Sequence, residues 1–185
     1  MMANLYRPRD VVAIEIQPTL AAMISRSAAI NQLKSVFAVN ADLCQKKIAG
    51  VDPASFDLVV ANPPYRATDS GRENPDHSRR VARGEGDTVL MDFVAASRRY
   101  ARTGGRVAFI FAARRSAELI SAMRSNHLEP KRIRFVHPQI AMPASVMLIE
   151  ARVGGGIEVA IEPPLILYEC PGIYTDETQA LLSAS

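Results

Sequence analysis

A short apolar run that stops at two consecutive prolines constrains this chain more than any other feature. Residues 58–61 (Leu-Val-Val-Ala) have the length and composition of a buried β-strand, and Asn-Pro-Pro-Tyr follows at residues 62–65. Neither proline has an N–H, so the strand cannot continue through them. Side chains at the carboxyl end of such a strand lie in the crevice where open α/β sheets bind ligands. The sequence therefore predicts a site here, the alternative being an ordinary proline turn with a packed tyrosine.

The residues of this corner suit attack by a planar, conjugated amine. Such an NH₂ group is a poor nucleophile because its lone pair is delocalised, but two fixed acceptors can bind its hydrogens and let the nitrogen pyramidalise. The side-chain oxygen of Asn62 and the carbonyl of Pro63 can be these acceptors, and the prolines fix the backbone. Tyr65 offers a flat face on which an extruded base can stack. The predicted catalytic residues are Asn62, Pro63, Pro64 and Tyr65.

Composition places the chain among ordinary globular proteins. With 185 residues, 48% of them hydrophobic, it suits one domain with a sizeable core, and a net charge of +3 permits nucleic-acid binding without requiring it. Cys44 and Cys170 form no disulfide or zinc pattern. The first ten residues lack the apolar core of a signal peptide, and no apolar run is long enough to span a membrane. We therefore expect a soluble cytoplasmic protein.

Strand and helix patterns alternate along the chain. The alternation predicts an α/β fold with a mostly parallel sheet and helices on both faces, ending in an antiparallel portion. Gly104 and Gly105 are expected to cap a helix. The expected strands are 11–16, 35–39, 56–61, 106–113, 132–137, 145–153 and 165–169, and the expected helices are 18–32, 43–49, 87–102, 116–126 and 175–182.

An acid ending one early strand and Asn-Pro-Pro-Tyr ending a later one carry a family resemblance. The chain resembles class I, Rossmann-like S-adenosylmethionine-dependent methyltransferases of the Asn-Pro-Pro-Tyr type, and within them most the tRNA1(Val) adenine-N6-methyltransferase family. The resemblance covers nearly the whole chain. It implies methyl transfer from S-adenosylmethionine to the N6 amine of an adenine in tRNA, with no metal because the sulfonium leaving group carries the driving force. The matching stretches are residues 12–17, 40–43, 62–65, 128–138, 163–168 and 174–175.

The same resemblance implies the residues that bind the cofactor. Glu15, with Ile16 beside it, would hold the ribose, because a carboxylate can accept hydrogen bonds from both hydroxyls. Asp42, with Leu43 beside it, would contact the adenine, and Asn62 would lie near the methyl group. From the residues alone two other readings stay open: Glu15 as a solvated acid at a strand end, and Asp42 as the N-cap of a following helix.

The long polar loop after the motif is rich in arginine. Near the mouth of a crevice these side chains can follow an RNA backbone, whereas the alternative is a solvated polar loop. A loop this long without periodicity is uncommon in a compact domain, which favours a functional role or disorder. The predicted RNA-binding residues are Arg66, Arg72, Arg79, Arg80 and Arg83.

The chain departs from the family pattern at its beginning, where the family has a strand and a Gly-rich turn. We expect a single, N-terminally truncated methyltransferase domain over residues 1–185, missing the first βα unit. That strand belongs in the middle of the sheet, so its two neighbours would keep unpaired backbone groups, at about 1–3 kcal/mol for each group left unsatisfied. Three explanations account for the missing strand. The chain is a fragment, another polypeptide completes it, or the sheet closes in a non-standard way; we favour a fragment. The chain alone is expected to bind cofactor poorly.

Other activities suit the same corner. The alternatives are an rRNA guanine-N2, a DNA adenine or a protein glutamine methyltransferase. A different class of alternative is a catalytically dead RNA-binding or partner subunit. The sequence carries no prediction of the oligomeric state.

Overall fold

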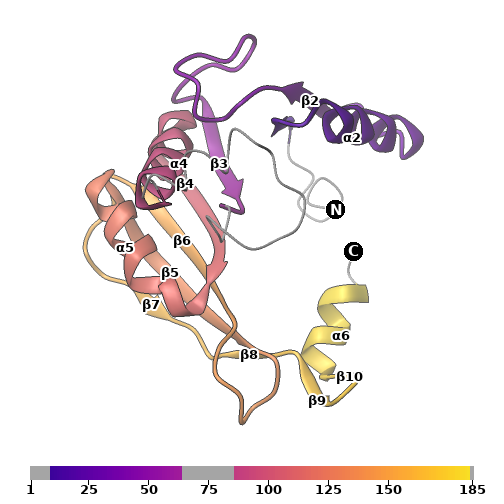
Figure 1. Cartoon of the computed structure of the whole chain (residues 1–185), viewed down its shortest axis with the longest axis vertical. Helices are drawn as coiled ribbons and strands as arrows, with labels where there is room; N and C mark the ends of the chain where they lie inside the picture. The colour runs from indigo at the N-terminus through magenta and orange to yellow at the C-terminus, as the bar shows by residue number, and fades with distance from the viewer. Residues whose placement is uncertain (1–8, 64–85, 184–185) are drawn as a thin grey trace. The chain divides into compact units, whose positions relative to one another are not determined.

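The computed structural model describes residues 9–63 and 86–183 and divides the chain into two compact units (Figure 1). Unit 1 comprises Met1–Asp52 and Gln179–Ser185, and unit 2 comprises Pro53–Thr178. Each unit carries its own β-sheet.

Unit 1 is a two-stranded parallel sheet with one helix. Strand β1 (Val11–Glu15) pairs with β2 (Val36–Asn40), and helix α2 (Pro18–Ile30) connects them and packs on both. Pro18 begins the helix because its fixed φ suits the first turn, where its missing N–H costs nothing.

Unit 1 buries few large side chains. Among its described residues, 9–52 and 179–183, the buried apolar ones are Ala21, Ala28, Ile48 and Val51. Larger apolar side chains of α2 are exposed: Met23 by 50% and Ile30 by 79%. Because apolar burial is the main source of folding free energy, this unit has little to stabilise it from within.

Unit 2 carries the larger sheet. Its strands lie in the order β3-β4-β6-β5-β7, and β8 also pairs with β5. Strands β3 and β4 are parallel, β6 is antiparallel to both of its neighbours, and β7 and β8 run parallel to β5. The strand bounds are Phe56–Ala61 (β3), Ala101–Ala112 (β4), Leu128–His137 (β5), Val146–Val153 (β6), Ala160–Ile161 (β7) and Leu165–Ile166 (β8).

Short elements complete the chain. A small antiparallel pair, β9 (Tyr168–Cys170) and β10 (Ile173–Tyr174), precedes helix α6 (Asp176–Ser183). The remaining helices are α4 (Gly86–Tyr100), the 3₁₀ turn η1 (Ala113–Arg115) and α5 (Ser116–Ser125). None of the described helices is long and apolar enough to cross a membrane.

The main hydrophobic core lies in unit 2, where α4 and α5 pack on the sheet. Strand β4 alternates in burial: Val107, Phe109 and Phe111 are buried, whereas Arg106 and Ile110 are exposed. Leu119 and Met123 of α5 complete the same core. An alternating strand of this kind has one face on a core and one face in water.

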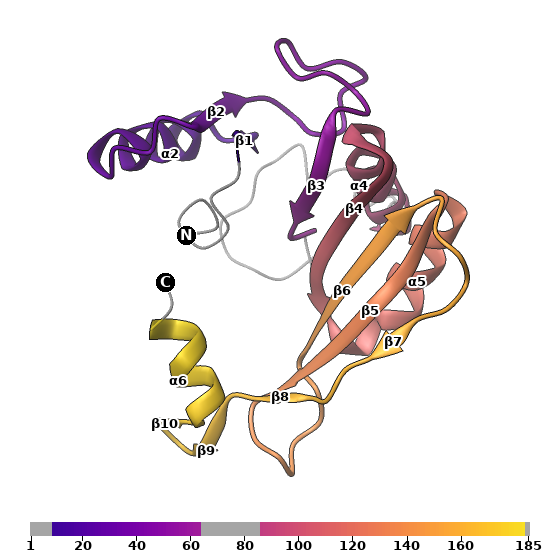
Figure 2. The ribbon, with the colours of Figure 1, turned by 180° about the vertical axis from the view of Figure 1, so that it is seen from behind.

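The other face of this sheet carries ion pairs. Arg106 pairs with Glu150 at 3.2 Å, and Arg132 pairs with Glu162 at 2.5 Å. The sequence predicts helices on both faces, but α4 and α5 both lie on one face of the sheet in unit 2 (Figures 1 and 2). The charged side chains explain the difference, because they satisfy one another while remaining accessible to water.

Strands β1 and β3 each have an open edge among residues 9–63 and 86–183. Strand β1 pairs with β2 alone, and β3 pairs with β4 alone. Each strand therefore offers one row of N–H and C=O groups to a further strand. These are the strands that the sequence predicts to flank a missing middle strand. The predicted α/β class with a mostly parallel sheet and an antiparallel strand near its end is confirmed.

Gly105 lies in a strand, and not at the helix end that the sequence predicts. The sequence predicts a helix cap at Gly104 and Gly105, but both lie inside β4, where the register against β3 shifts between Phe56 and Leu58. A Cβ on Gly105 would lie 2.8 Å from the carbonyl oxygen of Arg102 and 3.0 Å from that of Phe56. Backbone packing, and not helix termination, requires glycine here.

Gly105→Ala is expected to destabilise the protein by about 1–3 kcal/mol, because backbone atoms must move to admit the methyl group. The matched control is Gly156→Ala, since a Cβ at Gly156 meets nothing within 4 Å. That control should change stability by no more than about 0.5 kcal/mol. Urea unfolding of both variants measures the difference, and equal midpoints would contradict the assignment.

Candidate active site

The carboxyl ends of β1 and β2 form a hydrogen-bonded polar edge in unit 1. Glu15 and Asn40 are register partners at the last position of the ladder. The side-chain amide of Asn40 donates to the carbonyl oxygens of Glu15 at 2.9 Å and Ile16 at 3.0 Å. The Ala41 N–H also donates to the Glu15 carbonyl, at 3.1 Å. Asn40 therefore fixes the turn on which the predicted ribose-binding acid lies.

The Glu15 carboxylate is half-buried and partly engaged. Its Oε1 accepts the backbone N–H of Gln17 at 2.8 Å. An ionised carboxylate has about four acceptor sites, so this bond leaves capacity for the two hydroxyls of a ribose. Ile16, next in the chain, is 56% exposed and offers an apolar surface beside the acid.

Asp42 follows the end of β2 and organises a turn. Its Oδ1 accepts the N–H of Cys44 at 2.8 Å, and its carbonyl accepts the N–H of Gln45 at 3.1 Å. The helix expected over residues 43–49 is not formed; turns and a bridge between Ile48 and Val51 take its place. The bond to Cys44 resembles an N-cap, but an Asx turn explains it without a helix. Asp42 and Leu43 are half-buried, at the end where Glu15 and Ile16 lie.

The Asn-Pro-Pro-Tyr corner follows β3 in unit 2. Ala61 is the last residue of β3 and pairs with Phe109. Pro63 is fully buried, whereas Asn62 before it is exposed. A buried proline with a fixed φ anchors the corner and holds the amide at the strand end. The other predicted residues of the corner and its loop lie outside the described residues: Pro64, Tyr65, Arg66, Arg72, Arg79, Arg80 and Arg83.

The same edge of unit 2 carries a second feature, which the sequence reasoning did not identify. The Ala113 N–H after β4 donates to the Ser145 carbonyl at 3.1 Å, and the Ser145 N–H donates to the Val136 carbonyl at 2.9 Å. These bonds join the carboxyl ends of β4 and β5 to the start of β6. Between β5 and β6, residues 138–145 expose Ile140 by 84% and Met142 by 48%.

This loop is held in place. The Met142 N–H donates to the Gln139 carbonyl at 3.0 Å, and His137 Nδ1 donates to the Met142 carbonyl at 2.7 Å. Ile140 is therefore exposed on an ordered turn. The sequence signal for this exposed loop is that residues 138–149 contain no acidic residue.

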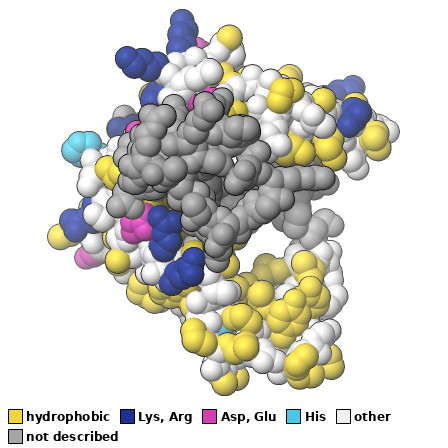
Figure 3. Space-filling model, viewed as in Figure 1, with side chains coloured by type: hydrophobic (Ala, Val, Ile, Leu, Met, Phe, Trp, Pro, Cys, Tyr) yellow, Lys and Arg dark blue, Asp and Glu magenta, His cyan; other side chains and the backbone are white. Residues whose placement is uncertain are grey.

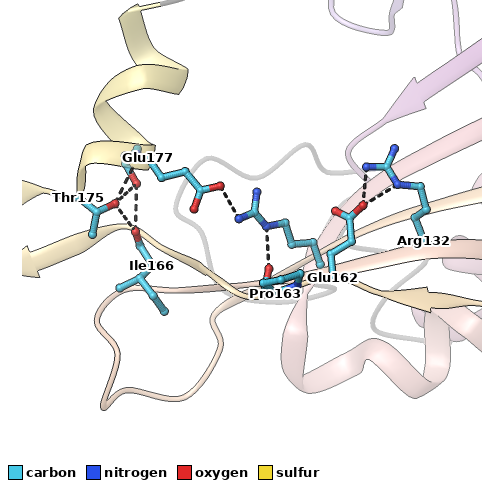
Figure 4. Close-up of polar contacts among 8 residues, drawn as sticks. Arg132, Glu162, Pro163, Ile166, Thr175 and Glu177 are labelled. Atoms are coloured by element: carbon cyan, nitrogen blue, oxygen red, sulfur yellow. Dashed lines mark hydrogen bonds and ion pairs between the residues drawn. The ribbon is translucent and has the colours of Figure 1, made fainter.

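The tail that carries the family resemblance is tied to β5 by polar contacts (Figure 4). Arg134 Nε donates to the Pro163 carbonyl at 2.9 Å, and its guanidinium pairs with Glu177 at 2.5 Å. The Thr175 hydroxyl donates to the Ile166 carbonyl at 2.7 Å and accepts the N–H of Thr178 at 3.3 Å, which caps α6.

Two tyrosines and nearby apolar side chains cover this tail. The rings of Tyr168 and Tyr174 stack with centroids 4.8 Å apart, and a hydrogen bond with Tyr174 raises the pKa of Tyr168. In Figure 3 hydrophobic side chains gather over the part of the molecule that holds β8, β9 and β10. Ile173 is 56% exposed in this region.

These features define the fold of class I, Rossmann-like methyltransferases: parallel pairs β1–β2 and β3–β4, an antiparallel β6 between β4 and β5, and polar residues after the carboxyl ends. The chain superposes on a predicted O-methyltransferase from Agrobacterium tumefaciens with a TM-score of 0.72, covering 95% of this chain and 77% of that one at 22% identity. The chain also superposes on geranyl diphosphate C-methyltransferase from Streptomyces coelicolor A3(2), solved with S-adenosyl-L-homocysteine, with a TM-score of 0.59. That match covers 83% of this chain and 67% of the other at 15% identity.

A curated relative agrees with the resemblance read in the sequence. The chain is 24% identical over 159 residues to the tRNA1(Val) (adenine(37)-N6)-methyltransferase of Aeromonas hydrophila, and the match spans 86% of this chain and 66% of that protein. The chain thus spans slightly under two thirds of the relative's length. No protein-family model matches the chain. The predicted resemblance to class I methyltransferases is confirmed.

Asn40→Asp is expected to loosen the polar edge of unit 1, because a carboxylate cannot donate to the carbonyls of Glu15 and Ile16. The free energy that stabilises this turn should fall by about 1 kcal/mol. Amide hydrogen exchange at Gln17 and Ala41 should accelerate. The control is Asn31→Asp, which removes a bond to Ser27 at the end of α2 and should leave those two amides unchanged. Unchanged exchange in Asn40→Asp would show that the amide does not hold this turn.

Proposed function

We propose that this protein transfers a methyl group from S-adenosylmethionine to the N6 amine of an adenine in tRNA. The observation that carries the proposal is Asn62, exposed at the carboxyl end of β3 and anchored by the fully buried Pro63. The fold shared with solved methyltransferases and the name of the Aeromonas relative support it. The cytoplasm, where tRNA is found, is the proposed compartment.

Residues of unit 1 fit the nucleoside part of the cofactor. The Glu15 carboxylate keeps acceptor sites for the ribose hydroxyls, and the exposed Ile16 offers an apolar contact. Asp42 and Leu43, which follow the end of the neighbouring strand, are proposed to contact the adenine. When bound, S-adenosylmethionine supplies an electrophilic methyl group on a sulfonium.

Residues of unit 2 fit the amine. The Asn62 side-chain oxygen and the Pro63 carbonyl accept the two amine hydrogens, so the nitrogen lone pair is released from the ring and directed at the methyl group. Pro63 has no N–H to compete for the same acceptors. Tyr65 is proposed to stack on the extruded base, and the five loop arginines to follow the RNA backbone. The apolar side chains of Ile140 and Met142, on the same edge of unit 2, are proposed to contact unpaired bases beside the target.

We further propose that residues 1–185 are one methyltransferase domain that lacks its first βα unit. The open edges of β1 and β3 support this, since a strand between them would pair both. The exposed Val60 of β3 and Ile110 of β4 also offer an apolar surface on which the helix of that unit is proposed to pack. An extended form of the protein or another polypeptide would supply the unit.

Asn62→Ala should lower methyl transfer about a hundredfold or more, because the amine loses one of its two fixed acceptors. Transfer of labelled methyl groups from S-adenosylmethionine to unmodified tRNA measures this, in a fusion that places a strand, Gly-rich turn and helix from a solved class I methyltransferase before residue 10. Asn31→Ala, on the exposed end of α2, is the control and should retain activity. Equal rates in the two variants would exclude Asn62 from catalysis.

Analysis of the labelled product separates the rival activities. N6-methyladenosine in tRNA supports the proposal. N2-methylguanosine in rRNA, N6-methyladenine in DNA or methylglutamine in a release factor would replace it with the corresponding rival. RNA binding without methyl transfer to any of these would identify a catalytically dead subunit.

A further inference from the structure

Arg114 follows the end of β4, on the edge of unit 2 that also carries the proposed catalytic corner. Ala61, the last residue of β3, pairs with Phe109 of the parallel strand β4. Asn62 and Arg114 follow this last pair by one and five residues, so both lie at the carboxyl ends of neighbouring strands. Figures 1 and 2 show β3 and β4 side by side and running toward the same side of unit 2.

The backbone around Arg114 is fixed by hydrogen bonds. Residues 113–115 form the 3₁₀ turn η1, which leads directly into α5. The Ala113 N–H donates to the Ser145 carbonyl at 3.1 Å, and the Ser116 N–H donates to the Ala113 carbonyl. Arg114 is therefore carried on an ordered turn at a defined distance along the chain from the end of the sheet.

The Arg114 side chain is exposed and has no partner among residues 9–63 and 86–183. Its neighbour Arg115, by contrast, pairs with Glu118, and its guanidinium carbon lies 5.3 Å from the centre of the Phe111 ring. A guanidinium is a planar fork of donors that matches the oxygens of a phosphate. Arg115 is thus engaged within the protein, whereas Arg114 is available to a ligand.

The chain segments on this edge carry positive charge and no acid. Residues 110–117 and 137–145, at the ends of β4 and β5, contain two arginines and one histidine and no Asp or Glu. At the opposite edge of the same sheet, Arg102 pairs with Asp57 at 2.7 Å and Arg124 pairs with Glu129 at 3.4 Å. Those arginines are neutralised by neighbouring carboxylates, whereas the charge of Arg114 remains to attract an anion.

We propose that Arg114 binds a backbone phosphate of the RNA substrate beside the catalytic corner. The inference rests on the proposed methyl transfer to tRNA and adds a substrate-binding residue to that site. A base that leaves its stack to reach Asn62 brings the phosphates of its own nucleotide to the same edge. Phosphate contacts position a nucleic acid without reading its sequence. Arg114 therefore holds the RNA in place, and recognition of the bases falls to other residues.

Binding of tRNA to the 185-residue protein at several salt concentrations, followed by fluorescence anisotropy, tests the proposal. Arg114→Gln should weaken binding about fivefold near physiological salt, because one phosphate contact is lost. The slope of log affinity against log salt concentration should fall by about 1. Arg114→Lys should keep the slope and recover part of the affinity, because lysine keeps the charge but not the planar fork.

The matched control is Arg98→Gln. Arg98 lies in the last turn of α4, at the opposite edge of the sheet, and likewise has no partner among the residues that the structure describes. Its loss should change neither the affinity nor the slope. Circular dichroism should be the same for the wild-type protein and the three variants, which shows that they remain folded.

Equal effects of Arg114→Gln and Arg98→Gln would overturn the proposal, as would an unchanged affinity of Arg114→Gln or a wild-type protein that binds no tRNA. A DNA duplex bound as tightly as tRNA, with the same dependence on Arg114, would overturn the assignment to RNA.

The inference and the proposed function can fail separately. RNA binding that depends on Arg114, in a protein that transfers no methyl group, supports the phosphate contact and removes the methyltransferase proposal. Methyl transfer to tRNA with undiminished tRNA affinity in Arg114→Gln does the reverse.

Discussion

The ladder between β3 and β4 is the interaction on which the proposed catalytic corner depends. Val59 and Ala61 of β3 pack against the core formed by β4 and the two helices, and the parallel pairing fixes where β3 ends. The apolar strand ends before the prolines, which cannot continue it. Pro63 is buried, whereas Asn62 is exposed to water. The amide that we propose to be catalytic is thereby held at the edge of the main hydrophobic core of unit 2. Positioning of this kind needs a rigid support, and the unit 2 core supplies one.

Unit 1 differs from unit 2 because its polar contacts are well formed but its hydrophobic core is small. Its site residues are well connected, since Asn40 holds the carbonyls of Glu15 and Ile16, but few large side chains are buried beneath them. Strand β1 also has an open edge, as does β3 among the described residues. A methyltransferase sheet needs both groups of residues at adjoining strand ends. The proposed additional strand would satisfy both edges and give unit 1 the packing that it lacks.

The sequence predicted the features that depend on local chemistry. The apolar runs located the strands, Pro18 located the start of α2, and Asn-Pro-Pro-Tyr located the corner. It failed where tertiary contacts decide the outcome. Gly104 and Gly105 read as a helix cap because both signals are local, yet the close approach of Phe56 places them within β4. The ion pairs on one face of the sheet join strands that are distant in sequence, so no local pattern encodes them.

We propose that residues of unit 1 bind the nucleoside of the cofactor, that residues of unit 2 bind the amine, and that cofactor binding requires a further strand on the open edges of β1 and β3. Titration calorimetry with S-adenosylmethionine tests it most directly, comparing the 185-residue protein with the fusion that supplies a strand, Gly-rich turn and helix. We predict that the fusion binds S-adenosylmethionine at micromolar concentration, that Glu15→Ala abolishes this binding, and that the chain alone shows no measurable binding. Micromolar binding by the 185-residue chain itself would contradict it and show that the open edges of β1 and β3 need no further strand.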